Sequence, residues 1–204
     1  MTRGATRERI EQTALELFSA RGYDRTSLRE IAEQLGVTKA AVYYHFRSKE
    51  DIVAALFEER LRAVEDVIAW AQAQPPDLRS RREALLRYEA VLTRTAPLSG
   101  LFQENRAALR DLAVGAAYHD MMMRALELLR IPGAGLACQL RTITALLVVH
   151  GAPKALESVA GGTEEKRAAA LTVALELLAS AHADGDRPCE ARHDTGSPDR
   201  SHAS

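Results

Sequence analysis

Apolar residues recur along the chain at the spacing of an α-helix. Ile10, Ala14, Leu17 and Phe18 stand at positions i, i+4, i+7 and i+8, which places them on one face of a helix. Gly22 follows this pattern and is typical of a residue just beyond a helix end. The sequence therefore predicts a first helix that is apolar on one side and ends before Gly22.

Two short helices are expected next. In the first, Ser27 and Glu30 form a capping box, in which each side chain bonds to the backbone N–H of the other residue. Its apolar stripe ends at Gly36, a residue suited to the left-handed turn after a helix, and consists of Leu28, Ile31, Ala32 and Leu35. Thr38 caps the following helix, whose apolar positions are Ala41, Val42 and Phe46.

Longer helices are expected in the rest of the chain. A further capping box at residues 48–51 starts a helix of about 20 residues that stops at Pro75 and Pro76. More helices are predicted near 79–95, 99–113, 116–130, 136–150 and 164–183, with a short helical piece between Pro153 and Val159. The breaks between them are expected at Pro97, Gly115, Pro132–Gly133 and Gly161–Gly162.

Composition supports an all-α protein. Ala, Leu, Glu and Arg dominate the 204 residues, and aromatic residues make up only 5%. The apolar pattern divides the chain into a three-helix domain at 1–50, a connecting helix at 51–75, a larger helical domain at 76–183 and a tail at 184–204. That tail has almost no large apolar side chains, so we expect it to be disordered.

Charge and special residues narrow the possible functions. The whole chain has a net charge of −1, but residues 1–50 carry nine Lys and Arg against seven Asp and Glu. No export signal or membrane span is apparent, which predicts a cytoplasmic protein. Cys138 and Cys189 are too few for a disulfide framework, and no metal-ligand spacing, cofactor motif or catalytic set is found. We therefore expect no enzyme, metal or cofactor.

The two short helices around Gly36 form a helix-turn-helix, whose second helix can lie in the major groove of double-stranded DNA. Val42 and Phe46 are expected on the buried side of this second helix. The remaining residues, which face outward, are Thr38, Lys39, Ala40, Tyr43, Tyr44 and His45. Exposed tyrosines have no packing role, whereas they can bond phosphate or lie against a sugar or a thymine methyl group. This pattern indicates a DNA-reading face.

This segment resembles the N-terminal signature of the TetR family of transcriptional regulators. The residues that carry the resemblance are Phe18, Gly22–Tyr23, Thr26–Ser27, Ile31–Ala32, Gly36–Lys39, Val42–Phe46 and Ser48–Lys49. They cover about the first 50 residues in one ordered block; the rest of the chain resembles the family only in being helical.

The resemblance implies roles for individual residues. Thr38, Lys39, Ala40 and Tyr43 would contact bases or lie beside them, although Ala40 offers only a methyl group where many relatives have glycine or a hydroxyl residue. Five residues would contact the phosphate backbone: Thr26, Ser27, Tyr44, His45 and Lys49. Without the resemblance, Lys39, His45 and Lys49 would be interpreted as ordinary surface residues.

The resemblance also implies a homodimer and a small-molecule effector. Helices near 136–150 and 164–183 would form the dimer interface, so that two reading helices meet an inverted-repeat operator. Side chains that suit an apolar or amphipathic effector are Tyr88, Phe102, Tyr118, His119, Met122 and His150. Met and aromatic residues at helical spacing are, however, more often part of the core than of a pocket. Repression fits the family best, with activation left open. The alternative is a DNA-binding adaptor whose C-terminal domain binds a protein and no small ligand.

Overall fold

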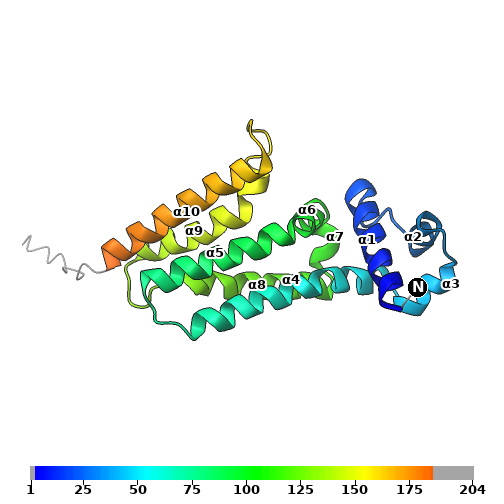
Figure 1. Cartoon of the computed structure of the whole chain (residues 1–204), viewed down its shortest axis with the longest axis horizontal. Helices are drawn as coiled ribbons and strands as arrows, with labels where there is room; N and C mark the ends of the chain where they lie inside the picture. The colour runs from blue at the N-terminus through cyan, green and yellow to red at the C-terminus, as the bar shows by residue number, and fades with distance from the viewer. Residues whose placement is uncertain (1–2, 186–204) are drawn as a thin grey trace, which may run out of the picture.

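The computed structural model describes residues 3–185, and all regular secondary structure in that range is helical. Helices α1 to α3 form a small domain at one end of an elongated molecule, and the later helices form the larger body (Figure 1). The expected all-α architecture, a helix-turn-helix domain followed by a larger helical domain, is confirmed.

The N-terminal domain follows the predicted pattern closely. It consists of α1 (Arg3–Arg21), α2 (Leu28–Leu35) and α3 (Lys39–His45), with α2 packed against both neighbours. Ser27 and Glu30 form the complete capping box, and Gly36 takes the left-handed conformation at φ 67°. The turn between α2 and α3 is therefore specified by local chemistry.

Helix α4 (Lys49–Gln72) runs from this domain along the lower side of the larger body in Figure 1. The Ser48 side chain caps it by accepting a hydrogen bond from the Asp51 amide. After the two prolines, Asp77 caps α5 (Leu78–Arg94), which packs alongside α4. One long helix therefore connects both parts of the chain.

The middle of the chain differs from the prediction. Instead of one helix over 99–113, the structure has α6 (Ala96–Glu104) and α7 (Arg106–Arg110), followed by α8 (Ala113–Leu126) and the 3-10 turn Glu127–Leu129. Pro97 lies in the first turn of α6, where its missing N–H costs no helical bond.

Gly115 is not a helix break, because it lies inside α8. Its backbone approaches α7 so closely that a Cβ atom there would stand 2.4 Å from the Leu109 carbonyl oxygen. The glycine therefore serves tight helix packing.

The last two helices lie side by side (Figure 1). They are α9 (Leu136–Ala155) and α10 (Thr163–Gly185). The separate helical piece expected after Pro153 is wrong, because α9 continues through this proline for its final turn. Only a few residues follow it in the helix, which limits the cost of the lost backbone bond. Of the tail predicted at 184–204, the first two residues belong to α10, and residues 186–204, with Cys189, lie outside the described range.

One continuous hydrophobic core joins the two parts. It extends from Phe18 and Val42 in the N-terminal domain through Phe57 on α4 to Leu85 and Leu146 in the larger body. Among the helices of residues 3–185, none is long and apolar enough to span a bilayer.

Candidate functional site

The outward side of α3 carries two exposed aromatic rings. Tyr43 is 45% exposed and Tyr44 is 65% exposed, whereas Val42 and Phe46 are buried beneath them. Thr38, Lys39 and Ala40 are also exposed, and His45 is half-buried. We call these six outward residues (38–40 and 43–45) the α3 face.

Local bonds hold the α3 face in place. The Thr38 hydroxyl accepts a hydrogen bond from the Ala41 amide at 3.2 Å, which caps α3. The Lys39 ammonium lies 5.2 Å from the Tyr43 ring centroid, and the Tyr44 and His45 rings meet edge-on at 5.2 Å. The face is therefore built on a short, fixed helix that presents aromatic, hydroxyl and cationic groups together.

A hollow of about 430 Å³ lies beside the α3 face. It is lined by residues 24–30 together with Lys39, Tyr43 and Lys49. The structure therefore brings together, around one depression, residues from the start of α2, from α3 and from the start of α4.

Thr26 and Lys49 are placed differently from the phosphate contacts that the sequence suggested. Thr26 is only 2% exposed, and its hydroxyl donates to the Gly22 carbonyl oxygen at 3.0 Å. The Lys49 ammonium donates to the Tyr23 carbonyl oxygen at 2.8 Å and lies 4.3 Å from the Tyr23 ring. In this structure both side chains fix the loop between α1 and α2, while the Ser27 side chain stays exposed.

The same loop is also bonded to the larger body. The Tyr23 amide donates to the Asn105 side-chain oxygen at 2.7 Å, and the Asn105 side-chain amide donates to the Leu101 carbonyl at 2.9 Å. Asn105 lies at the junction of α6 and α7, and it is buried. No sequence signal identified this link, because the two residues stand 82 positions apart.

Inside the larger body, His150 lies between two tyrosines. Its Nδ1 and the Tyr88 hydroxyl are 2.9 Å apart, as are its Nε2 and the Tyr118 hydroxyl. The Phe102 ring stacks on Tyr118 with centroids 4.0 Å apart. We call these four residues, with Arg60 described below, the interior polar cluster.

Burial changes the protonation of this cluster. It lowers the pKa of His150 from 6.5 to about 4, with a smaller contribution from the positive charge of Arg60, and it raises the pKa of both Tyr88 and Tyr118. Near pH 7 the imidazole is therefore neutral, with one nitrogen as donor and the other as acceptor.

Two residues predicted beside this cluster lie elsewhere. Met122 is half-buried and packs at the edge of the hydrophobic core. His119 is exposed on the outside of α8, because consecutive helix residues point about 100° apart and its neighbour Tyr118 faces the core. His119 therefore does not join the other predicted ligand residues.

Arg60 was missed by sequence reasoning. It lies on α4 with no exposed surface, and its guanidinium is 6.0 Å from the centroid of the Tyr118 ring. One of its terminal nitrogens donates to the Ser99 hydroxyl at 2.7 Å. An arginine within an amphipathic helix has the appearance of a surface residue in the sequence, so only the structure reveals this burial.

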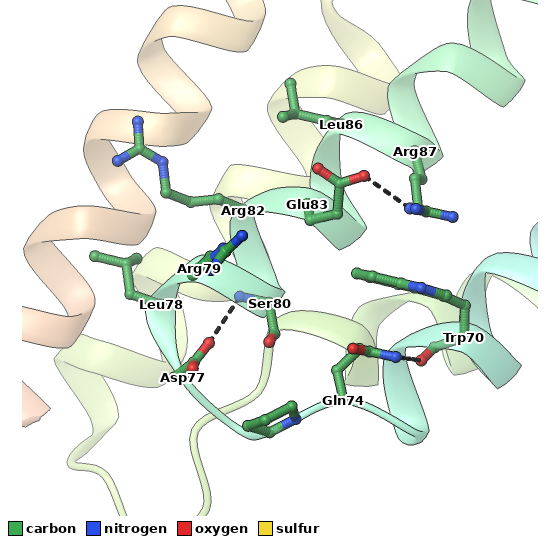
Figure 2. Close-up of a pocket in the computed structure, with 11 residues that line it drawn as sticks. Trp70, Gln74, Asp77, Leu78, Arg79, Ser80, Arg82, Glu83, Leu86 and Arg87 are labelled. Atoms are coloured by element: carbon green, nitrogen blue, oxygen red, sulfur yellow. Dashed lines mark hydrogen bonds and ion pairs between the residues drawn. The ribbon is translucent and has the colours of Figure 1, made fainter.

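Another pocket lies at the turn between α4 and α5. It has a volume of about 850 Å³, and Figure 2 shows the Arg87 guanidinium lying over the Trp70 ring, 4.0 Å from its centroid. Arg87 also pairs with Glu83 at 2.9 Å (Figure 2). None of the residues predicted to bind an effector lines this pocket.

The α9–α10 pair has an apolar outer face. Leu136, Leu140 and Leu147 are 90%, 65% and 46% exposed on α9, and Val173 is 45% exposed on α10. Their spacing along α9 places the three leucines on one side of the helix.

Within residues 3–185, no group of three or more His, Cys, Asp or Glu side chains is arranged to hold a metal ion.

Comparison with known proteins separates the two parts of the chain. Residues 10–56 match the family described as bacterial regulatory proteins, tetR family. The chain is 47% identical over 53 residues to the regulator AcrR of Shigella flexneri, covering 26% of this chain and 25% of AcrR. It is 46% identical over 46 residues to IcaR of Staphylococcus aureus (strain Newman), named a negative regulator of a biofilm operon, covering 22% and 25%. These matches span about a quarter of the relatives' length.

Solved structures extend the likeness to most of the fold. A transcriptional regulator from Aquifex aeolicus VF5 has a TM-score of 0.60 at 21% identity, covering 82% of this chain and 96% of that one. A tetR-family regulator from Syntrophomonas wolfei has a TM-score of 0.61 at 20% identity, covering 87% and 97%. At sequence identities this low, the structural similarity establishes the architecture of the chain alone.

Proposed function

We propose that this chain is a transcriptional regulator that binds double-stranded operator DNA, because residues 10–56 match the tetR family of bacterial regulatory proteins. In this proposal it acts as a homodimer and represses until a small effector binds. The observation that carries the proposal is the α3 face, which exposes Tyr43 and Tyr44 on a capped helix of a helix-turn-helix.

The α3 face has the dimensions and chemistry of a major-groove reader. A helix of seven residues fits the groove, and its N-terminal residues, Thr38, Lys39 and Ala40, would reach base edges together with Tyr43. Tyr44, His45 and Ser27 would contact phosphates, which set the register without reading sequence. Thr26 and Lys49 would contribute by holding the loop at residues 22–26 in shape.

The outer face of α9 and α10 supports self-association. A continuous apolar face on a monomer surface marks an interaction site, and two antiparallel pairs can combine into a four-helix bundle around a two-fold axis. Such a dimer would hold two α3 faces against an inverted repeat with half-sites about 34 Å apart.

The interior polar cluster supports an effector site in preference to a protein-binding adaptor. Arg60, Tyr88 and Tyr118 are buried and His150 is half-buried among α4, α5, α8 and α9, where a protein surface cannot reach. An effector would alter DNA affinity only if it binds more tightly to a state with the two reading helices differently placed. The name of IcaR as a negative regulator supports repression.

The test is a titration of the purified protein against the DNA upstream of its own gene, at several salt concentrations, with a scrambled duplex as control. We expect sequence-dependent binding of two chains per site. Tyr44→Ala should weaken it about tenfold by removing a bond to phosphate, without unfolding the domain, because Tyr44 is largely exposed. Asp120→Ala, at an exposed position on α8, is the matched control and should bind normally.

Equal, weak binding of the natural and scrambled duplexes would contradict operator recognition at that site. Normal binding by Tyr44→Ala would show that the α3 face does not contact DNA as proposed.

A further inference from the structure

Arg60 is a fully buried cation without a matching anion. Its Nε and Nη1 atoms have no hydrogen-bond partner among the described residues, and Ser99 is the partner of Nη2. No carboxylate within residues 3–185 forms an ion pair with it. Burial lowers the pKa of Arg60, and the two titratable groups that oppose this shift, Tyr118 and Tyr88, are neutral near pH 7. A buried charge without a partner costs free energy of folding, so the position of Arg60 needs an explanation.

The rest of the interior polar cluster is neutral and supplies no anion for Arg60. The neutral His150 uses its N–H toward one tyrosine and accepts from the other. The tyrosine that accepts keeps its own hydroxyl hydrogen for a further acceptor. Together with the two unpartnered nitrogens of Arg60, this hydroxyl leaves hydrogens without an acceptor and a positive charge without an anion.

From this imbalance we infer that Arg60 binds the carboxylate of an organic acid, which is the effector of this regulator. An ionised carboxylate is acceptor-only and carries the negative charge that the guanidinium lacks, so it would neutralise Arg60 and accept from an unpartnered nitrogen. The inference rests on the proposed function, because it names the chemical class recognised by the effector domain.

The surroundings favour a monocarboxylate with an apolar body. Phe57, Phe102 and Tyr118 stand within 6 Å of one another, centroid to centroid, and form an aromatic wall next to the guanidinium. One buried guanidinium neutralises one negative charge, whereas a phosphate dianion would enter this wall with a charge left over. An aromatic or short aliphatic acid fits both the charge and the wall.

The position of Arg60 gives such an acid a physical route to the DNA-binding domain. Arg60 on α4 is bonded to Ser99 on α6, and α6 ends at Asn105, which holds the Tyr23 amide. A carboxylate that draws the guanidinium away from Ser99 would loosen the bond between α4 and α6. The change would then reach the loop between α1 and α2 through Asn105.

The test is calorimetric titration with acetate, hexanoate and benzoate, each paired with its neutral amide. We expect hexanoate or benzoate to bind the full-length protein at least tenfold more tightly than the matching amide. Arg60→Met, which keeps the length of the side chain and removes the charge, should weaken binding of the acid about 10- to 100-fold and leave amide binding unchanged. Ser99→Ala, which keeps the guanidinium, should retain acid binding.

A second measurement separates recognition from a structural role. Without added acid, Arg60→Met should raise the midpoint of thermal unfolding, because it removes an unpaired buried charge. A structural arginine would give a lower midpoint. Hexanoate should raise the midpoint of the natural protein and leave that of Arg60→Met unchanged.

The inference is overturned if none of the three acids binds, if acids and amides bind alike, or if Arg60→Met binds the acid normally. Operator titration of the same preparation distinguishes the two proposals. Operator binding without acid binding would remove the carboxylate inference alone. Acid binding without operator binding would remove the proposed DNA function and the role of the acid as its effector, and would leave the carboxylate site at Arg60.

Discussion

The helix-turn-helix and the larger body place their polar side chains in opposite ways. In the first, Ser27 and Thr38 cap nearby amides, and the tyrosines of the α3 face point to solvent. In the second, Tyr88, Tyr118 and His150 are bonded across 62 and 32 positions of sequence in the interior. One region thus uses local polar bonds at its surface, and the other uses distant polar bonds in its core.

The two arrangements differ in how much free energy of folding their polar groups cost. An exposed tyrosine on α3 removes little from folding, because water solvates its hydroxyl before and after folding. A buried guanidinium or imidazole must be desolvated, and its partners must be positioned by several helices. The interior polar cluster should therefore depend on pH and on substitution far more than the α3 face does.

The largest expected effect concerns His150. The unfolded imidazole titrates near pH 6.5 and the folded one near pH 4, so between these values the unfolded chain binds more protons. The stability of the fold should fall as the pH falls from 6.5 to 4, by about 3 kcal/mol at most, and this loss should be absent above pH 6.5. Urea unfolding across this pH range measures it.

His150→Gln is the control, because an amide keeps one donor and one acceptor but does not titrate in this range. The difference in unfolding free energy between the two proteins should shrink as the pH falls. A constant difference from pH 4 to pH 7 would mean that His150 is not buried as a neutral group.

The sequence predicted the N-terminal region almost completely, because its structure follows from neighbouring residues. Ser27, Gly36 and Thr38 specify caps and a turn within a few positions of themselves, so their pattern can be recognised directly. The exposed tyrosines followed from the period of the apolar stripe. The dimer face on α9 remains a prediction, although its leucines are exposed as such a face requires.

The remaining features depend on tertiary packing. Gly115 appeared to break a helix, whereas its role is to let α8 approach the backbone of α7. Arg60 appeared to be a surface cation, and its burial depends on α5, α6 and α8 covering α4. His119 differs from Tyr118 only by which side of α8 it occupies. Such features require a map of distant contacts, which helical periodicity does not contain.

A smaller effect is expected where the two regions meet. Asn105→Ala removes the acceptor of the Tyr23 amide and leaves a buried donor unpaired, which should reduce the unfolding free energy by about 2 kcal/mol. Urea unfolding measures the loss, and hydrogen exchange at the Tyr23 amide should become faster. Glu104→Ala, at the neighbouring exposed position, is the control and should change neither quantity. Equal behaviour of both variants would mean that the regions are not coupled through this bond.

The smallest effect tests whether stability and DNA binding can be separated at the surface. Ser27→Ala removes the cap of α2 and should lower the unfolding free energy by about 1 kcal/mol. Ser27→Asp keeps a capping oxygen but loses the bond that the hydroxyl donates to Glu30, so its unfolding free energy should lie between the two. The aspartate would nevertheless weaken operator binding, because its charge would face the phosphate that Ser27 is proposed to contact. Urea unfolding and operator titration of both variants provide the measurement. If Ser27→Asp bound the operator normally, Ser27 would be a cap alone, and the surface region would lose one of its proposed phosphate contacts.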